Sequence, residues 1–309
     1  MNSVLIAYYS GTGGTAMAAK HFAQAFEKKG LHVITRQIRA GNLPDMKKCD
    51  MLLLLFPVYA LNAPKGVYQW LQKLPMSKDT WAAVISVSGG GEISPNTACR
   101  VGSIRRLENK GCNVYYENML IMPSNFIYGY EHPLSELLVQ VLPHKVSLMA
   151  DDLYNKVMRR TRPLPIDRLL TTLCVPERLF AGLYGRFHTV GSTCNACGWC
   201  VRNCPADSIQ MKDGKPTFLF RCQICMNCLY FCPKKAITPG LIKKIVLEEG
   251  YPINQWKDAK VDLENSQLDE LTNGYAMSGV RAYLQSAKNA CNDKGMLIVD
   301  SFLGSTCNT

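Results

Sequence analysis

Residues 1–160 alternate short apolar runs with segments of helical periodicity. Residues 4–8 are apolar at nearly every position, as expected of a strand buried on both faces. Apolar residues then recur at i, i+3, i+4 and i+7 over residues 19–26, which predicts a helix that Gly30 ends. Four more runs predict strands, at 32–35, 51–56, 81–87 and 114–122. Five strands alternating with helices predict an α/β domain, a doubly wound parallel sheet with helices on both faces.

The rest of the chain divides into three parts. Pro143 predicts the start of the last helix of the first domain, because proline is favoured in a first helical turn. Residues 161–190 contain three prolines and several arginines and are interpreted as a connector with one amphipathic helix. Residues 191–240 carry most of the cysteines and form a second predicted domain. Residues 241–309 form a C-terminal extension, helical in places, to which the sequence assigns no chemistry.

A glycine- and hydroxyl-rich segment, YYSGTGGTA, follows the first predicted strand at residues 8–16. Its Gly-x-Gly-x-x-Ala spacing is compatible with a dinucleotide pyrophosphate. Its Ser-Gly-Thr-Gly-x-Thr spelling is typical of a hydroxyl-lined site for a terminal phosphate. The dinucleotide interpretation requires an acid after the second strand, where Arg36 and Arg39 stand instead, so that it survives only as an NADP site.

Two further loops follow predicted strands, FPVYA at 56–60 and SVSGGGE at 86–92. Parallel strands bind ligands beyond their carboxyl ends, so that these loops and the first one are expected to meet. The set of three resembles flavodoxin over residues 1–160. The resemblance implies strand order 2-1-3-4-5 and bound FMN, with the phosphate on the hydroxyls and backbone N–H groups of the first loop. The expected FMN-binding residues are Ser10, Gly11, Thr12, Gly13, Gly14, Thr15, Pro57, Val58, Tyr59, Ala60, Ser88, Gly89, Gly90 and Gly91, with residues 122–126 as a further wall.

Eight of the fourteen cysteines lie in two runs, and the second run, from Cys222, repeats the first, from Cys194. Each run is Cys-x2-Cys-x2-Cys-x3-Cys-Pro, the spacing with which bacterial ferredoxins hold two [4Fe–4S] clusters. The fourth cysteine of such a run ligates the other cluster. A zinc module is disfavoured, because zinc takes four ligands per ion, usually as two spaced pairs. One predicted cluster takes Cys194, Cys197, Cys200 and Cys232, and the other takes Cys222, Cys225, Cys228 and Cys204.

The cysteine-rich segment resembles a two-cluster bacterial ferredoxin, which implies a small α+β domain. A segment this short buries little core, so that bound clusters are expected to stabilise it. A few large apolar side chains are expected to cover the clusters and limit water. They are Ile209, Phe218, Phe220, Ile224, Phe231 and Ile237.

Charge and hydropathy indicate where in the cell the chain works and which partners it has. No apolar run approaches the roughly 20 residues that span a bilayer, and no leader is recognised, so that a cytoplasmic location is expected. The net charge is +11, and residues 191–240 contain six lysines and arginines against two acids. This basicity favours an acidic redox partner protein or peripheral contact with an anionic membrane surface. No motif indicates nucleic-acid binding.

The two halves together resemble the flavodoxin–ferredoxin fusion proteins of anaerobic microbes. The resemblance implies an electron carrier that moves electrons among two [4Fe–4S] clusters, FMN and an outside protein. An alternative is a flavin-dependent oxidoreductase that reduces a small substrate with electrons from its clusters. A third interpretation is a redox sensor. The sequence contains no hydrolytic triad and no P-loop lysine motif, and its five histidines are isolated from one another.

Overall fold

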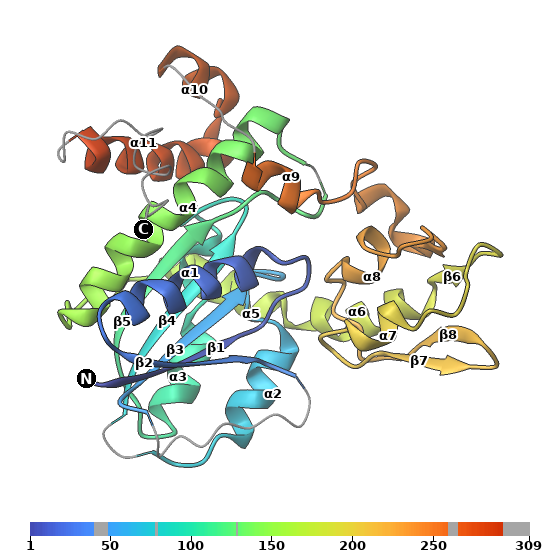
Figure 1. Ribbon diagram of the computed structural model, residues 1–309, viewed down its shortest axis with the longest axis horizontal. Helices are drawn as coiled ribbons and strands as arrows, with labels where there is room; N and C mark the ends of the chain where they lie inside the picture. Colours follow the sequence, from blue (N-terminus) through green and yellow to red (C-terminus); the bar gives the residue numbers. More distant parts are fainter. Residues whose placement is uncertain (40–48, 78–79, 128, 259–264, 293–309) are drawn as a thin grey trace, which may run out of the picture.

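The computed structural model describes residues 1–39, 49–77, 80–127, 129–258 and 265–292. Five parallel strands form one sheet in the order β2-β1-β3-β4-β5 (Figure 1). They are β1 (Ser3–Tyr8), β2 (His32–Gln37), β3 (Met51–Pro57), β4 (Trp81–Ser88) and β5 (Asn113–Ile121). This is the flavodoxin-like order of a doubly wound sheet. The fold class predicted for residues 1–160 is therefore confirmed.

Helices cover both faces of the sheet (Figure 1). The helices α1 (Gly14–Lys28) and α4 (His132–Tyr154) lie on one face, and α2 (Lys65–Lys73) and α3 (Val101–Glu108) lie on the other. Successive residues of a strand point to opposite faces, so that Leu53 packs in the core under α1 and α4 while Leu54 packs under α2 and α3. Burial on both faces explains why β3 is apolar without interruption.

The helix α4 begins well before the position that the sequence predicts. It starts at His132, with Pro133 in its first turn, and Pro143 lies inside it rather than at its start. A proline inside a helix removes one backbone hydrogen bond. Here the apolar side chains before it, from Leu134 to Leu142, are largely buried in the core under α1 and α4, and their burial outweighs that loss.

The connector contains two helices, α5 (Pro165–Leu173) and α6 (Val175–Arg186), where the sequence predicts one. The cysteine-rich segment that follows is a mixture of short helices and two-stranded sheets, drawn in Figure 1 as a lobe beside the sheet. Strand β6 (Thr189–Val190) pairs with β9 (Ile237–Thr238), and β7 (Ile209–Lys212) pairs with β8 (Lys215–Phe218). The short helices are α7 (Trp199–Arg202) and α8 (Asn227–Tyr230).

The C-terminal extension joins the core of the first domain. It forms η3 (Gly240–Ile245), α9 (Ile253–Asp258), α10 (Asn265–Leu271), η4 (Tyr275–Met277) and α11 (Ser278–Asn292). The helices α9 and α11 pack on α4, and Trp256 and Tyr283 are buried in the same core as α1 (Figure 1). Residues 259–264 and 293–309 of the extension lie outside the described residues. Among the helices that are described, none is long and apolar enough to cross a membrane.

Candidate cofactor site

A cleft of about 1120 Å³, including space open to solvent, lies at the carboxyl ends of the strands. Segments that follow β1, β3, β4 and β5 form its walls. Of the residues predicted from sequence, those that line it are Ser10, Gly11, Thr12, Gly14, Thr15, Pro57, Val58, Tyr59, Ala60, Ser88 and Gly89. Residues 122–126, expected as a further wall, also line it. The doubly wound topology brings these distant segments together because all parallel strands end at the same edge.

Hydroxyl groups gather where α1 begins. The side chains of Ser10, Thr12 and Thr15 belong to buried residues and line the cleft. Ser10 Oγ accepts a hydrogen bond from the N–H of Ala16 (3.3 Å), and Thr12 Oγ1 accepts one from Asn125 Nδ2 (2.8 Å). The first N–H groups of a helix have no partner within the helix and favour an anion there. This end of the cleft has the donors that a phosphate requires.

Tyr59 stands on a tight turn that holds it against the phosphate loop. Tyr59 and Asn62 exchange both backbone hydrogen bonds, and the two residues between them, Ala60 and Leu61, have φ values of 46° and 57°. Left-handed backbone at two consecutive non-glycine residues is strained, and such strain concentrates at functional sites. The buried side chain of Asn62 stabilises the turn by donating to the carbonyl oxygens of Ala60 (3.0 Å) and Thr171 (2.9 Å).

The opposite wall of the cleft comes from parts of the chain that the sequence analysis does not place there. Ala181 belongs to α6, Gln223 and Ile224 belong to the second cysteine run, and Tyr251 belongs to the C-terminal extension. Tyr251 Oη donates to the carbonyl oxygen of Pro123 (3.0 Å), which ties the extension to the loop after β5. A lone tyrosine so far along the chain from the sheet carries no local signal of this role.

Three predicted residues flank the cleft without lining it. Gly13, with φ of 104°, is the residue before α1 and serves the turn through its backbone. Gly90 and Gly91 lie against α11, where a Cβ on Gly91 would stand 2.9 Å from the carbonyl carbon of Gly279. Their contact with a ligand stays a prediction, because they adjoin residues that line the cleft but are not part of its lining. Arg39, considered for an NADP phosphate, instead donates to the carbonyl oxygen of Arg202 (2.8 Å).

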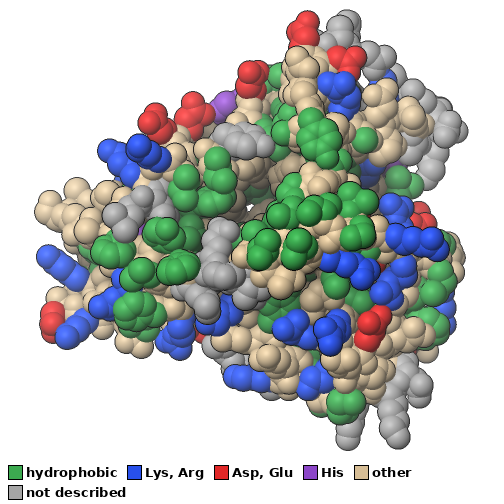
Figure 2. Space-filling view, turned by 180° about the vertical axis from the view of Figure 1, so that it is seen from behind, with side chains coloured by type: hydrophobic (Ala, Val, Ile, Leu, Met, Phe, Trp, Pro, Cys, Tyr) green, Lys and Arg blue, Asp and Glu red, His purple; other side chains and the backbone are tan. Residues whose placement is uncertain are grey.

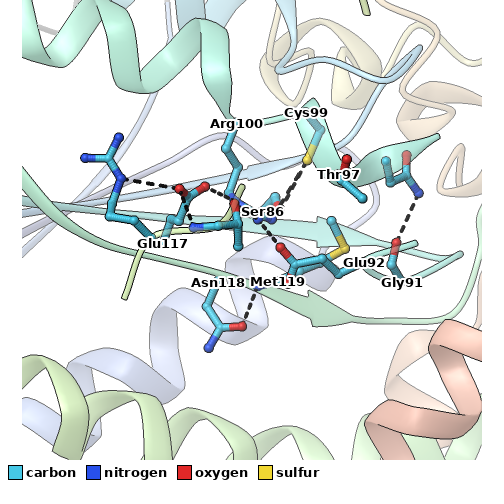
Figure 3. Close-up of polar contacts among 12 residues, drawn as sticks. Ser86, Gly91, Glu92, Thr97, Cys99, Arg100, Glu117, Asn118 and Met119 are labelled. Carbon is cyan, nitrogen blue, oxygen red and sulfur yellow. Dashed lines mark hydrogen bonds and ion pairs between the residues drawn. The ribbon is translucent and has the colours of Figure 1, made fainter. Parts of the chain in front are cut away.

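A buried ion-pair network connects the glycine-rich loop to the neighbouring strands (Figure 3). The guanidinium of Arg100 is fully buried and donates to Glu117 Oε2 (2.8 Å) and Ser86 Oγ (2.9 Å). It also pairs with Glu92, the residue that follows Gly91. Arg100 is the residue before α3, and its partners lie on β4, β5 and the loop. The network therefore holds the loop against these strands.

We expect Glu117→Ala to lower the free energy of unfolding by about 3 kcal/mol, because it removes one partner of a buried charge. The more exposed pair between Lys29 and Asp151 provides the control, and Asp151→Ala should cost less than about 1 kcal/mol. Urea denaturation of both variants measures the difference. Equal effects of the two substitutions would show that the Arg100 network adds no special stability.

The eight predicted cluster ligands surround two separate cavities in the cysteine-rich segment. One cavity is lined by Cys204, Cys222, Cys225 and Cys228, and the other is lined by Cys194, Cys197, Cys200 and Cys232. Each cavity thus collects three cysteines of one run and the last cysteine of the other. Among the described residues, no group of three or more histidine, cysteine or carboxylate side chains is arranged to hold a metal ion.

The sequence repeat is also a repeat of backbone conformation. Ala196 and Ile224 have φ values of 54° and 50°, and Gly198 and Met226 have values of 71° and 64°. The members of each pair occupy equivalent positions in the two runs. A β-branched residue such as Ile224 is rarely found with positive φ, which marks a constrained loop. Alternation of this kind turns backbone N–H groups toward the inside of a loop.

Three cysteine sulfurs accept hydrogen bonds from backbone N–H groups. Ser208 donates to Cys204 Sγ (3.3 Å), and Ala236 donates to Cys232 Sγ (3.4 Å), again at equivalent positions of the repeat. In the second run Ile224 donates to the sulfur of Cys222 (3.4 Å). Such bonds stabilise thiolates and influence the reduction potential of a cluster.

The two cavities differ in depth. Burial raises the pKa of Cys222 to about 11 and raises the pKa values of Cys225 and Cys228 as well. In the other cavity Cys197 is exposed, although Cys200 there is buried and burial raises its pKa as well. His188, which the sequence treats as isolated, lines the deeper cavity, and burial lowers its pKa to about 4, so that its ring is neutral at neutral pH. The deeper cavity is therefore an apolar environment.

The predicted apolar cover of the cysteines is correct in part. Ile209, Phe218 and Ile224 line the deeper cavity and Ile237 lines the other. Phe231 lines neither cavity but is partly buried against the core of the first domain, with its ring 6.2 Å from that of Trp199. The prediction that Phe220 covers a cluster is wrong, because its side chain is 64% exposed and lines neither cavity. It lies just beyond β8, where the backbone packs against Gly182 of α6 and the side chain is left outside.

The cleft and the deeper cavity share a wall. Gln223 and Ile224 each belong to the lining of both spaces. Gly11 of the phosphate loop lies so close to the second run that a Cβ on it would stand 2.7 Å from Cys225 Cβ. Gln223 Oε1 accepts a hydrogen bond from the N–H of Gly66 (3.3 Å), which joins the run to α2. A ligand in the cleft is thus separated from the deeper set of thiols by a single turn of chain.

Comparison with known proteins gives structural matches only. No protein-family model matches the chain, and no curated protein matches it in sequence. A flavodoxin of Streptococcus pneumoniae is 18% identical, with a TM-score of 0.38, and the match covers 50% of this chain and 99% of that one. The flavodoxin of Megasphaera elsdenii is 23% identical, with a TM-score of 0.33, over 38% of this chain and 85% of that one. The fold assignment rests on the strand order described above.

Proposed function

We propose that this chain is an electron-transfer protein that holds FMN in the cleft and two [4Fe–4S] clusters in the cysteine-lined cavities. The observation that carries the proposal is the shared wall at Gln223 and Ile224, which brings the cleft and one set of four cysteines together. FMN exchanges one or two electrons and each cluster exchanges one. The role of the chain is to hold the three sites in a fixed order.

One end of the cleft offers hydrogen-bond donors and the other offers apolar surface, as the phosphate and the ring of FMN require. Ser10, Thr12 and Thr15, with the N-terminus of α1, supply neutral donors for a dianionic phosphate. Tyr59, Met122 and Tyr251 supply apolar and aromatic surface for the flavin ring. The N–H of Gly90 donates to Ser88 Oγ (3.2 Å), which stabilises the loop beside that surface. These residues support a mononucleotide flavin over a dinucleotide.

Thr15→Val tests the phosphate assignment, because it removes one hydroxyl and keeps the shape of the side chain. A hydrogen bond to a charged group contributes about 1.5–3 kcal/mol, so that FMN affinity should fall roughly tenfold or more. Riboflavin lacks the phosphate, and its affinity should stay the same. Fluorescence titration of flavin-free protein measures both. A loss of equal size for the two flavins would place Thr15 away from the phosphate.

Each cysteine-lined cavity has the number of thiols that a cubane cluster requires. Each offers four thiols, and backbone N–H groups already donate to the sulfurs of Cys204, Cys222 and Cys232. Apolar side chains complete both linings. Such surroundings support thiolate ligands and limit access of water to them.

The difference in depth supports an order of transfer. The cavity of Cys222, Cys225 and Cys228 adjoins the flavin cleft, and the cavity of Cys194 and Cys197 lies nearer the surface. Exposed lysines surround the outer cavity, at positions 212, 215, 234 and 235. An acidic redox protein is therefore the partner we propose at the outer cavity.

Anaerobic purification followed by iron, sulfide and flavin analysis tests the cofactor content. We expect about eight irons per chain, the content of two cubanes, and one FMN. About four irons, or FAD in place of FMN, would overturn the respective part. An enzyme would oxidise NAD(P)H or reduce a quinone without a partner protein. Sustained turnover of that kind by the pure protein would replace the carrier with the oxidoreductase alternative.

A further inference from the structure

The connector helix α5 packs with its polar face toward the protein. Asp167 is fully buried and accepts hydrogen bonds from Ser94 Oγ (2.6 Å) and from the N–H and hydroxyl of Thr97. Burial acts to raise the pKa of Asp167, but these bonds outweigh it and hold the pKa below its usual value. The apolar side chains of Ile166, Leu169 and Leu173 point outward and are 53–63% exposed. The helix is thus inverted relative to an ordinary surface helix.

The helix α6 is inverted in the same way. Its small residues face the cysteine-rich segment, where a Cβ on Gly182 would stand 2.1 Å from the carbonyl oxygen of Phe220. A Cβ on Gly185 would stand 2.2 Å from Cys222 Cβ. Close packing of this small-residue face leaves the large side chains outside. Exposed apolar residues recur at i, i+3, i+4 and i+7, and they are Phe180, Leu183, Tyr184 and Phe187.

Phe220 extends this surface, with the guanidinium of Arg186 lying 4.8 Å from the centre of its ring. We call the exposed apolar residues of α5 and α6, together with Phe187 and Phe220, the connector patch. Figure 2 shows hydrophobic side chains gathered in the middle of the face turned away in Figure 1, with lysine and arginine beside them. Contiguous exposed apolar surface of this kind marks an interaction site.

Among the described residues of the connector and of the segment around Phe220, the exposed charges have one sign. Within residues 161–174, 180–190 and 218–222, the exposed charged side chains are Arg162, Arg168, Arg186 and Arg221. The acid described in these ranges, Asp167, is buried and hydrogen-bonded. Large aliphatic and aromatic side chains bordered by arginines are the composition of helices that lie in the interface of an anionic membrane.

We propose that the connector patch docks the protein on the surface of an anionic lipid bilayer. The leucine, isoleucine and phenylalanine side chains enter the headgroup boundary, and the four arginines contact lipid phosphates. Two features favour a bilayer over a protein partner. The apolar side chains project from the outer faces of two helices, and the exposed charged side chains described in residues 161–174, 180–190 and 218–222 are all arginines. Ala181 of α6 lines the cofactor cleft, so that docking brings that cleft close to the membrane.

Vesicle co-sedimentation of the full chain, purified with its cofactors, tests the proposal. The probes are vesicles of phosphatidylcholine alone and vesicles with an equal share of phosphatidylglycerol. We expect binding to the anionic vesicles, weakened by salt, and little binding to phosphatidylcholine. The variant Leu169→Glu/Phe180→Glu should bind at least about tenfold more weakly, because both side chains lose their apolar insertion. Arg162→Glu/Arg168→Glu should remove most of the vesicle binding that is sensitive to salt.

Tyr275→Glu is the matched control, since Tyr275 is 70% exposed on η4 and belongs to the C-terminal extension rather than to the connector. It should bind vesicles like the parent protein. Flavin absorbance and iron content, measured on every variant, separate a loss of docking from a loss of folding. Absence of binding to anionic vesicles overturns the proposal, as does full binding by the Leu169→Glu/Phe180→Glu variant. A stable dimer that this variant converts to monomer, seen by light scattering, assigns the patch to a second copy and also overturns it.

Discussion

Replacing Cys204 with serine is expected to remove about four of the roughly eight irons and to disconnect the flavin from the cluster that remains. Cys204 belongs to the first run in sequence, but it lines the cavity of Cys222, Cys225 and Cys228. Its loss should therefore empty the cavity that shares a wall with the cleft. The remaining cluster would be the one near the surface, at Cys194 and Cys197.

Cys232→Ser is the matched control, because it removes the corresponding ligand of the other cavity. It should also cost about four irons, but it keeps the cluster beside the cleft. After photoreduction of the flavin, transfer to the remaining cluster should be slower in Cys204→Ser than in Cys232→Ser. Iron analysis and transient absorption measure the two effects. The reverse order of rates would mean that each run holds its own cluster without exchange of the fourth ligand.

Gly11→Ala is expected to weaken FMN binding roughly tenfold to a hundredfold. An alanine Cβ would stand 2.7 Å from Cys225 Cβ and 2.9 Å from both the carbonyl oxygen of Cys225 and Tyr59 Oη. Backbone on both sides has to move, and overpacking of this kind costs about 1–3 kcal/mol. The phosphate loop and the second cysteine run would separate, so that the affinity for riboflavin should fall together with that for FMN.

Gly191→Ala is the control for a glycine substitution in the cysteine-rich lobe. Its Cβ would stand 3.6 Å from the carbonyl oxygen of Ala236, an ordinary contact, and FMN affinity should not change. Fluorescence titration of flavin-free protein gives the affinities, and iron analysis shows whether the lobe remains intact. If Gly11→Ala binds FMN as tightly as the parent, the loop and Cys225 are not held together as the structure shows.

The inverted helices α5 and α6 show why the surface is harder to predict than the sheet. Their apolar periodicity is the ordinary sign of a helix that buries its apolar face. The buried Asp167 and the glycines at 182 and 185 reverse this, because hydrogen bonds and close backbone packing hold the other face inward. The sequence places Phe220 in the cluster cover for the same reason, since its apolar character alone suggests burial.

Two features of this protein follow from its sequence alone. Continuous apolar runs between amphipathic segments predict the parallel sheet, because strands buried on both faces tolerate few polar residues. The repeated cysteine spacing predicts two sets of four thiols, because three cysteines at every third position of a tight loop face the same point and the last cysteine of each run completes the other set. Both signals are local, so that no knowledge of distant contacts is needed to recognise them.

The tertiary structure alone decided which of these parts meet. It placed Tyr251 in the wall of the cleft, brought Gly11 against Cys225, and put Gln223 and Ile224 between the cleft and the deeper cavity. Tertiary packing also lets α4 continue past Pro143, because the burial of the apolar side chains of α4 outweighs the one hydrogen bond that the proline removes. Contacts between segments far apart in the chain depend on how whole surfaces fit together, and no short stretch of sequence records that fit.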